Sequence, residues 1–141
     1  MLINRHTLPN GLTLLHSHTT DTQMVAVNIL YKVGARNESP VQTGFAHLFE
    51  HLMFGGSANI ADYDTPLQMA GGENNAYTTN DITNYYITLP ASNIETAFWL
   101  ESDRMLSLAF TPESLLRQTD GLAYRRKYEK RYCVEDEYCS E

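Results

Sequence analysis

Residues 45–53 read Phe45-Ala46-His47-Leu48-Phe49-Glu50-His51-Leu52-Met53. Large apolar side chains recur there at intervals of three and four residues, which is the period of an α-helix with one apolar face. We expect this apolar stripe to face the protein core; it consists of Phe45, Leu48, Phe49, Leu52 and Met53. Gly55 and Gly56 follow and are expected to end the helix.

The same helix carries a pattern typical of a zinc site. His47 and His51 lie one turn apart, about 40° from each other around the axis, so two imidazole nitrogens can reach one ion. Glu50 lies beside His47, where its carboxylate can act as a general base on metal-bound water. All three side chains point away from the apolar stripe. Structural histidines of a core would interrupt that stripe, so the pattern favours metal ligands.

The flanking segments predict strands. Asn10-Gly11 between apolar residues is typical of a tight hairpin turn. Residues 25–33 alternate between larger apolar side chains and the residues between them, which predicts a strand with one buried face that ends at Gly34. Residues 84–89 predict a second strong strand closed by Pro90. The Asp-, Gly- and Asn-rich residues between Gly56 and this strand are expected to form a loop.

Two further helices are predicted after Pro90. Residues 92–95 have the spacing of a capping box and open the first helix, whose expected buried residues are Ile94, Ala97, Phe98, Met105 and Leu108. Thr111-Pro112 opens the second. This order of elements indicates an α+β fold, a largely antiparallel sheet with helices packed on it.

The composition and net charge of the chain limit the classes of partner that it is expected to bind. The chain has 141 residues, of which 43% are hydrophobic, and a net charge of −7. An acidic protein repels phosphate backbones, so we expect no nucleic-acid partner. We find neither the apolar stretch of a signal peptide nor a run long enough to cross a membrane, so we expect a soluble protein of the cytoplasm or periplasm without a membrane partner.

Several stretches together resemble the pitrilysin, insulysin and mitochondrial-processing-peptidase family of zinc metallopeptidases, the inverzincins with an HxxEH motif. They are His47–His51 with Gly44-Phe45-Ala46 before it, Asn10-Gly11-Leu12, Val33–Arg36 and Gly72–Thr78. The resemblance runs from about residue 5 to 116 and is closest to bacterial members. It implies a truncated half-domain of the processing-peptidase fold, with Zn²⁺ held by His47 and His51 and with Glu50 as catalytic base.

The resemblance also implies a substrate site. The segment Asn75-Ala76-Tyr77-Thr78 would lie on an edge strand beside the metal, where a peptide or unfolded polypeptide binds as an added strand. From the residues alone, an Asn-rich turn leading into a strand is the alternative. Family members pair two homologous halves or subunits, so a second half is an expected partner.

The third zinc ligand is less well defined. The family uses a glutamate on a later helix, and Glu129 is the candidate here, although another alignment places this position at Tyr124–Lys127. The likeness weakens after residue 116. We therefore divide the chain into a zinc-metallopeptidase-like domain, 1–116, and a diverged or frame-shifted C-terminal helix and tail, 117–141.

Three functions compete. The first is a fragment of a zinc metalloendopeptidase that hydrolyses peptide bonds with zinc-activated water and is inactive as the isolated chain. The second is a non-catalytic peptide-binding or structural subunit of the same fold. The third is a thioether-cleaving quorum-signal synthase, which would complete an iron site with a cysteine such as Cys133, but the Gly72–Thr78 segment does not fit it.

Overall fold

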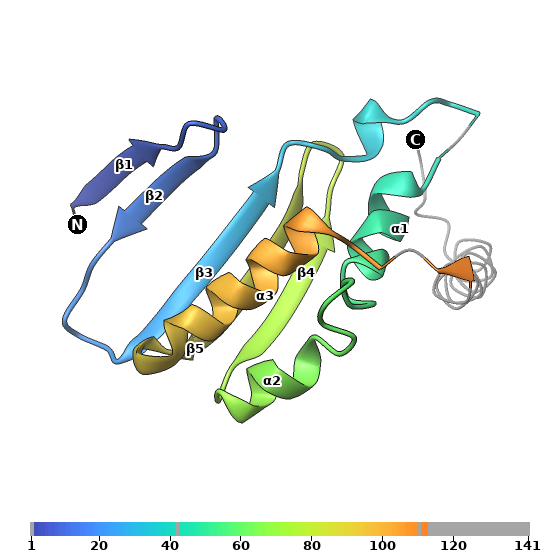
Figure 1. Cartoon of the computed structure of the whole chain (residues 1–141). Coiled ribbons are helices and arrows are strands. Elements are labelled where there is room, and N and C mark those ends of the chain that lie inside the picture. The colour runs from blue at the N-terminus through green and yellow to red at the C-terminus, as the bar shows by residue number, and fades with distance from the viewer. Residues whose placement is uncertain (1, 42, 110, 113–141) are drawn as a thin grey trace, which may run out of the picture.

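The computed structural model describes residues 2–41, 43–109, 111 and 112 and has an α+β fold with antiparallel sheets. Figure 1 shows a two-stranded hairpin, a three-stranded sheet and three α-helices. The predicted fold class is confirmed. Two short 3₁₀ turns, η1 (Ala35–Asn37) and η2 (Ala91–Asn93), complete the described elements.

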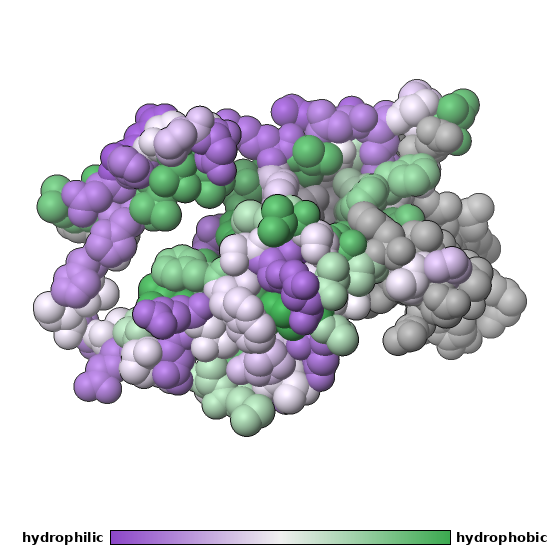
Figure 2. Space-filling view, viewed as in Figure 1, coloured by the Kyte–Doolittle hydropathy of each residue, from purple (hydrophilic) through white to green (hydrophobic). Residues whose placement is uncertain are grey.

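The hairpin joins β1 (Ile3–Thr7) to β2 (Thr13–Ser17). Gly11 adopts a φ of 88°, and the Leu12 N–H donates to Asn10 Oδ1 at 3.1 Å, as a tight Asn-Gly turn requires. The predicted hairpin is therefore confirmed. All ten strand residues are exposed, and Figure 2 shows hydrophobic and hydrophilic side chains lying next to one another along it.

The main sheet has the order β3-β5-β4, and both pairings are antiparallel. Its strands are β3 (Met24–Tyr31), β4 (Glu73–Thr78) and β5 (Thr83–Pro90). The exposure of β3 alternates along its whole length, which confirms the predicted strand, and β5 confirms the second strand with Pro90 as its last residue. β4 is an edge strand, as the family resemblance implied, so the alternative of an Asn-rich turn is wrong.

The core lies between this sheet and helices α2 (Asp64–Met69) and α3 (Ile94–Leu106), with α3 crossing one face of the sheet in Figure 1. Its buried residues are Ile60, Tyr63, Leu67, Ile87, Leu89, Ala97 and Leu100. The loop predicted after Gly56 is therefore wrong in part, because it contains α2 and β4. The Asp62 carboxylate starts α2 by accepting from the N–H groups of Asp64 (3.0 Å) and Thr65 (3.2 Å).

Helix α3 exists as predicted but buries a different face. Its buried residues are Ala97, Leu100, Glu101 and Arg104. The predicted core residues Phe98 and Met105 are 50% and 44% exposed, respectively. The capping box predicted from Ser92 is also wrong, because Ser92 donates to Asn93 Oδ1 at 3.4 Å. Asn93 is the capping residue of α3, and its side chain makes no cap and donates to the Ala70 carbonyl at 2.9 Å.

Several predictions fall on the C-terminal part of the chain. The helix predicted from Thr111 lies, after Pro112, outside the described residues, and so do Glu129, Cys133 and the whole segment 117–141. Across residues 2–112, apart from positions 42 and 110, the helices are too short or too polar to cross a bilayer.

Candidate metal centre

Helix α1 (Phe45–Leu52) brings His47 and His51 together. Their Nε2 atoms lie 3.1 Å apart, and their ring centroids 4.8 Å. Two nitrogens bound to one tetrahedral zinc at about 2.0–2.1 Å each are separated by roughly 3.3 Å, so the observed pair fits two sites of one coordination sphere. Both rings are partly buried, so each residue keeps some exposure to solvent.

A third ligand is not found among the described residues, where no group of three His, Cys, Asp or Glu side chains could hold a metal. The predicted third ligand, Glu129, lies outside them. The structure therefore brings together the two predicted histidines, and the three-ligand set that a zinc site normally needs requires a group from elsewhere.

Glu50 faces the edge strand β4. The Thr78 hydroxyl donates a hydrogen bond to Glu50 Oε2 and lies 3.4 Å from the hydroxyl of Thr83 on the next strand. Thr78 belongs to the segment predicted to bind substrate, but here it orients the predicted general base. No local pattern predicts this contact, because 28 positions separate the two residues.

The four predicted substrate residues point alternately to the two faces of β4. Ala76 and Thr78 are partly buried on the side of α1, whereas Asn75 and Tyr77 are exposed. The Ala76 N–H donates to Asn75 Oδ1 at 2.8 Å. In the part of the chain that the structure describes, no strand pairs with the outer edge of β4.

The N-terminal end of α1 is held by a carboxylate that sequence reasoning missed. Glu38 accepts hydrogen bonds from the N–H groups of Gly44 (2.6 Å) and Ala46 (2.7 Å). Gly44 adopts a φ of 93°, which lets the chain turn into the helix. Glu38 thus satisfies donors that the first turn leaves unpaired and places a negative charge at the positive end of the helix dipole.

Replacing Glu38 with alanine should destabilise the protein. Both hydrogen bonds are lost with a favourable charge–dipole interaction, and loss of a helix cap costs about 0.5–2 kcal/mol. We expect the free energy of unfolding, measured with urea, to fall by about 1–2 kcal/mol. The Ser39→Ala change in the exposed neighbouring residue is the control, and equal losses in both variants would contradict the assigned cap.

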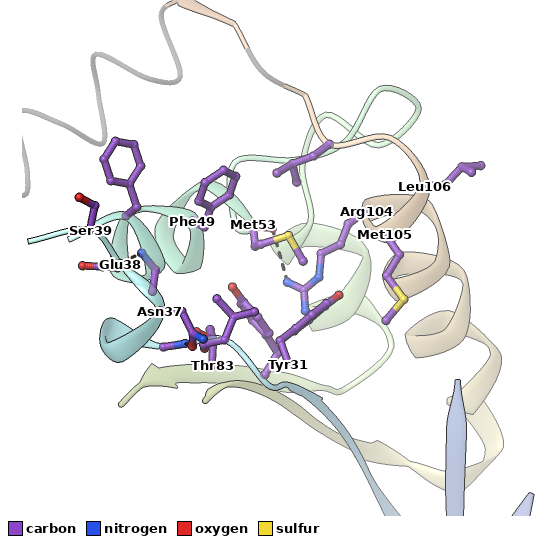
Figure 3. A pocket seen from close by; sticks show the side chains of 16 residues that line it. Tyr31, Asn37, Glu38, Ser39, Phe49, Met53, Thr83, Arg104, Met105 and Leu106 are labelled. Atoms are coloured by element: carbon purple, nitrogen blue, oxygen red, sulfur yellow. Dashed lines mark hydrogen bonds between the residues drawn. The ribbon is translucent and has the colours of Figure 1, made fainter. Parts of the chain in front are cut away.

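The apolar stripe of α1 is only partly buried, so the expectation that it faces the core is wrong in part: Leu52 is 3% exposed, but the two phenylalanines are not buried. Phe45 and Phe49 are each 48% exposed, and Ala46 and Leu52 are the buried residues of the helix. Phe45, Phe49 and Met53 of the stripe instead line a cavity of about 680 Å³ between α1 and α3, and Tyr31 and Tyr85 also contribute to its lining. Figure 3 shows Phe49, Met53 and Tyr31 around this cavity.

Charged side chains affect the pKa of the tyrosines near the candidate metal centre. Burial raises the pKa of Tyr85 above its usual value; the Arg104 guanidinium opposes this rise, and the Glu50 carboxylate adds to it. Burial likewise raises the pKa of Tyr63, again against the effect of Arg104. Both phenols therefore remain protonated at neutral pH and can donate hydrogen bonds.

The chain is similar in sequence to a named zinc protease and to a mitochondrial-processing peptidase subunit. Over 125 residues the chain is 34% identical to the zinc protease PqqE of Helicobacter pylori, covering 86% of this chain and 28% of that protein. It is 29% identical to a probable mitochondrial-processing peptidase subunit beta of Arabidopsis thaliana, covering 81% of this chain and 22% of that protein. The chain thus spans less than a third of the length of these relatives.

The chain is also similar to solved structures of peptidases. A protease from Helicobacter pylori superposes with a TM-score of 0.84 at 33% identity, over 90% of this chain and 31% of that one. Pitrilysin superposes with a TM-score of 0.76 at 21% identity, over 83% of this chain and 13% of that one, which shows a shared fold. Residues 13–138 match the insulinase family, peptidase family M16. The chain therefore belongs to the insulinase family of peptidases.

Proposed function

We propose that this chain is part of a zinc metalloendopeptidase in which His47 and His51 hold the metal and Glu50 acts as general base. The observation that carries the proposal is the 3.1 Å separation of the two Nε2 atoms on one helix, with Glu50 next to His51 in the sequence and held against β4 by Thr78. Relatives named as zinc proteases support the choice of metal.

Each residue of the proposed site has a separate role in peptide hydrolysis. Zinc, when bound, lowers the pKa of its water to about 7 and polarises a carbonyl group. Glu50 would act as the proton acceptor for water held there, and Thr78 orients its carboxylate by donating to Oε2, which would leave Oε1 as the accepting oxygen. Glu129, which lies outside the described residues, is the proposed third ligand.

The substrate would be an extended peptide or unfolded polypeptide that adds to the outer edge of β4. Main-chain groups of an edge strand provide affinity, and side chains on alternate faces read the peptide. Asn75, Ala76, Tyr77 and Thr78 would form this edge beside α1. The hydrogen bond from the Ala76 N–H to Asn75 Oδ1 would give way to a peptide carbonyl.

Peptide-bond cleavage would need parts of the enzyme that this chain does not contain. Because it spans less than a third of its relatives, we propose that the isolated chain is inactive and that a homologous second half or subunit completes the enzyme. The alternative is a non-catalytic, peptide-binding or structural subunit. If turnover stays absent when the remaining part of the protein is restored, while peptide still binds, the alternative replaces the peptidase.

Zinc content tests the site directly. The purified chain should bind about one equivalent of zinc, and His47→Ala should lose it, because a single histidine leaves too few ligands. His16→Ala, in the exposed β2 strand, is the matched control and should retain zinc. Elemental analysis after dialysis gives the ratio. A metal-free wild-type protein, or full zinc retention by His47→Ala, would overturn the assignment.

A further inference from the structure

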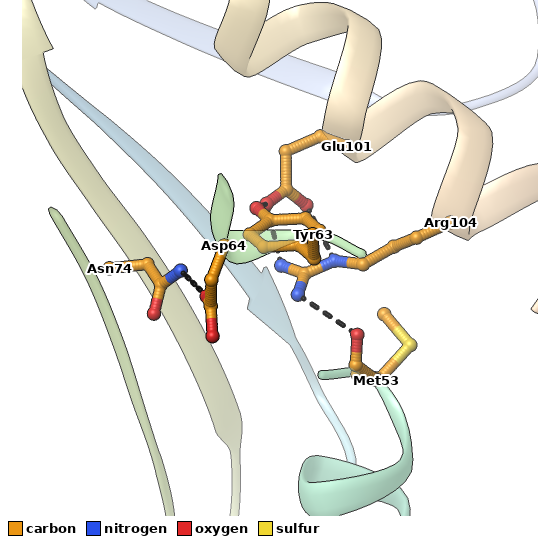
Figure 4. A network of polar contacts seen from close by, with 6 residues as sticks. All are labelled: Met53, Tyr63, Asp64, Asn74, Glu101 and Arg104. Atoms are coloured by element: carbon orange, nitrogen blue, oxygen red, sulfur yellow. Dashed lines mark hydrogen bonds and ion pairs between the residues drawn. The ribbon is translucent and has the colours of Figure 1, made fainter. Parts of the chain in front are cut away.

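Arg104 of α3 lies inside the protein and reaches the end of the metal-site helix. It is 3% exposed, and its Nη1 donates to the carbonyl of Met53, the residue that caps α1, at 3.4 Å. Figure 4 shows the guanidinium extending from α3 toward this carbonyl. Met53 is two positions beyond His51, so the contact falls on the turn that carries the second histidine.

The guanidinium is held in a fixed orientation. Glu101, one turn earlier on α3, accepts from Arg104 Nε at 3.0 Å and from Nη2 at 2.6 Å. The Tyr63 hydroxyl donates to Glu101 Oε1 at 2.5 Å. The Arg104 Cζ atom also lies 4.7 Å from the centre of the Tyr63 ring and 4.5 Å from that of Tyr85, within range of cation–π attraction.

The charge of Arg104 also suits its place. Carbonyl groups at the C-terminal end of a helix carry partial negative charge, so a cation there is favourable. Glu38 provides the opposite charge at the N-terminal end. Helix α1 has eight residues, and so short a helix is marginal without such contacts. His47 lies in its first turn and His51 in its last, so the geometry of the pair depends on both ends.

A buried ion pair is weak support for stability, since an apolar pair of similar volume often serves as well. What an apolar pair cannot supply is a donor directed at the Met53 carbonyl. We propose that Arg104, oriented by Glu101 and Tyr63, is a positioning residue that keeps the last turn of α1 wound and so sets the separation of the His47 and His51 imidazoles. This inference rests on the proposed function in treating the two imidazoles as ligands.

Zinc affinity of the full chain tests the proposal. Arg104→Lys keeps the charge but cannot bind Glu101 through two nitrogens while donating to Met53. We expect it to weaken zinc binding about tenfold, as loss of groups that orient metal ligands commonly does. Affinity is measured by competition with a chromophoric chelator at a temperature where circular dichroism shows every variant folded.

Two further variants make the measurement decisive. Arg36→Lys is the control, because Arg36 forms an exposed ion pair with Asp81 at 2.8 Å, and its zinc affinity should match the wild type. Tyr63→Phe removes one hydroxyl and should weaken zinc binding a few-fold, and it stands in if Arg104→Lys does not fold. Unchanged affinity in a folded Arg104→Lys or Tyr63→Phe protein would overturn the proposal.

A metal-free measurement separates this proposal from the proposed function. The ring centroids of His47 and His51 lie 4.8 Å apart, so NMR of the metal-free chain should show a nuclear Overhauser effect between the ring protons of the two imidazoles. Arg104→Lys should abolish this signature and Arg36→Lys should keep it. If the wild type binds no zinc yet this pattern holds, the zinc function fails and positioning by Arg104 stands. An Arg104→Lys spectrum identical to the wild type would overturn positioning.

Discussion

Replacing Glu101 with alanine is expected to lower the free energy of unfolding by about 3–5 kcal/mol, the cost of leaving one member of a buried ion pair alone. The Arg104 and Glu101 side chains are 2% and 5% exposed, respectively, and lie 2.6 Å apart. Without Glu101, the Arg104 charge and the Tyr63 hydroxyl both lose a buried acceptor. Urea unfolding followed by circular dichroism measures the loss.

A matched glutamate on the same helix provides the control. Glu95 lies in the exposed first turn of α3, so Glu95→Ala should cost less than about 1 kcal/mol. The double variant Glu101→Met with Arg104→Met removes both charges and should be more stable than Glu101→Ala. A loss in Glu101→Ala no larger than that in Glu95→Ala would contradict a paired charge in the core.

Local patterns were sufficient to predict every described strand except β4. Gly11 has the positive φ that its Asn-Gly turn suggested, and the alternation over residues 25–31 corresponds to a strand with alternating burial. Both features depend on neighbours within two residues, so the sequence displays them directly. The HxxEH spacing is equally local, and the helix brings His47 and His51 together as that spacing predicted.

Helix α2 was missed although a local signal existed. It is six residues long and contains Pro66 within its first turn, so neither length nor periodicity marks it. Asp62, however, accepts from the N–H of Thr65 three residues later and also from its hydroxyl. An aspartate followed by a residue that can bond back to it is a typical helix start, and this cue was available in the sequence.

The residues that support the candidate site could not be predicted from local sequence. Arg104 reaches Met53 across 51 positions, and Thr78 reaches Glu50 across 28. Glu38 contacts its helix only because η1 and the following loop bring it back over the first turn. Each of these contacts is created by the tertiary fold, so no periodicity or spacing in the sequence predicts it. A charged residue such as Arg104 is moreover normally expected at the surface.

Leu100→Ala and Phe98→Ala should differ sharply in stability, with the larger loss at the smaller side chain. Leu100 is 0% exposed within the core cluster, so its truncation should lower the free energy of unfolding by about 2–5 kcal/mol through lost burial and a cavity. Phe98 is 50% exposed, so its truncation should cost less than about 1 kcal/mol. Urea unfolding of the two variants gives both values.

The relative stability of Leu100→Ala and Phe98→Ala decides which face of α3 packs on the sheet. The apolar pattern favoured the face with Phe98 and Met105, because Glu101 and Arg104 count as polar and conceal the stripe that they share with Leu100. Pairing with each other lets these two charges occupy core positions that the pattern assigns to apolar residues. A larger loss in Phe98→Ala than in Leu100→Ala would restore the sequence-based face, and Arg104 could then not reach α1.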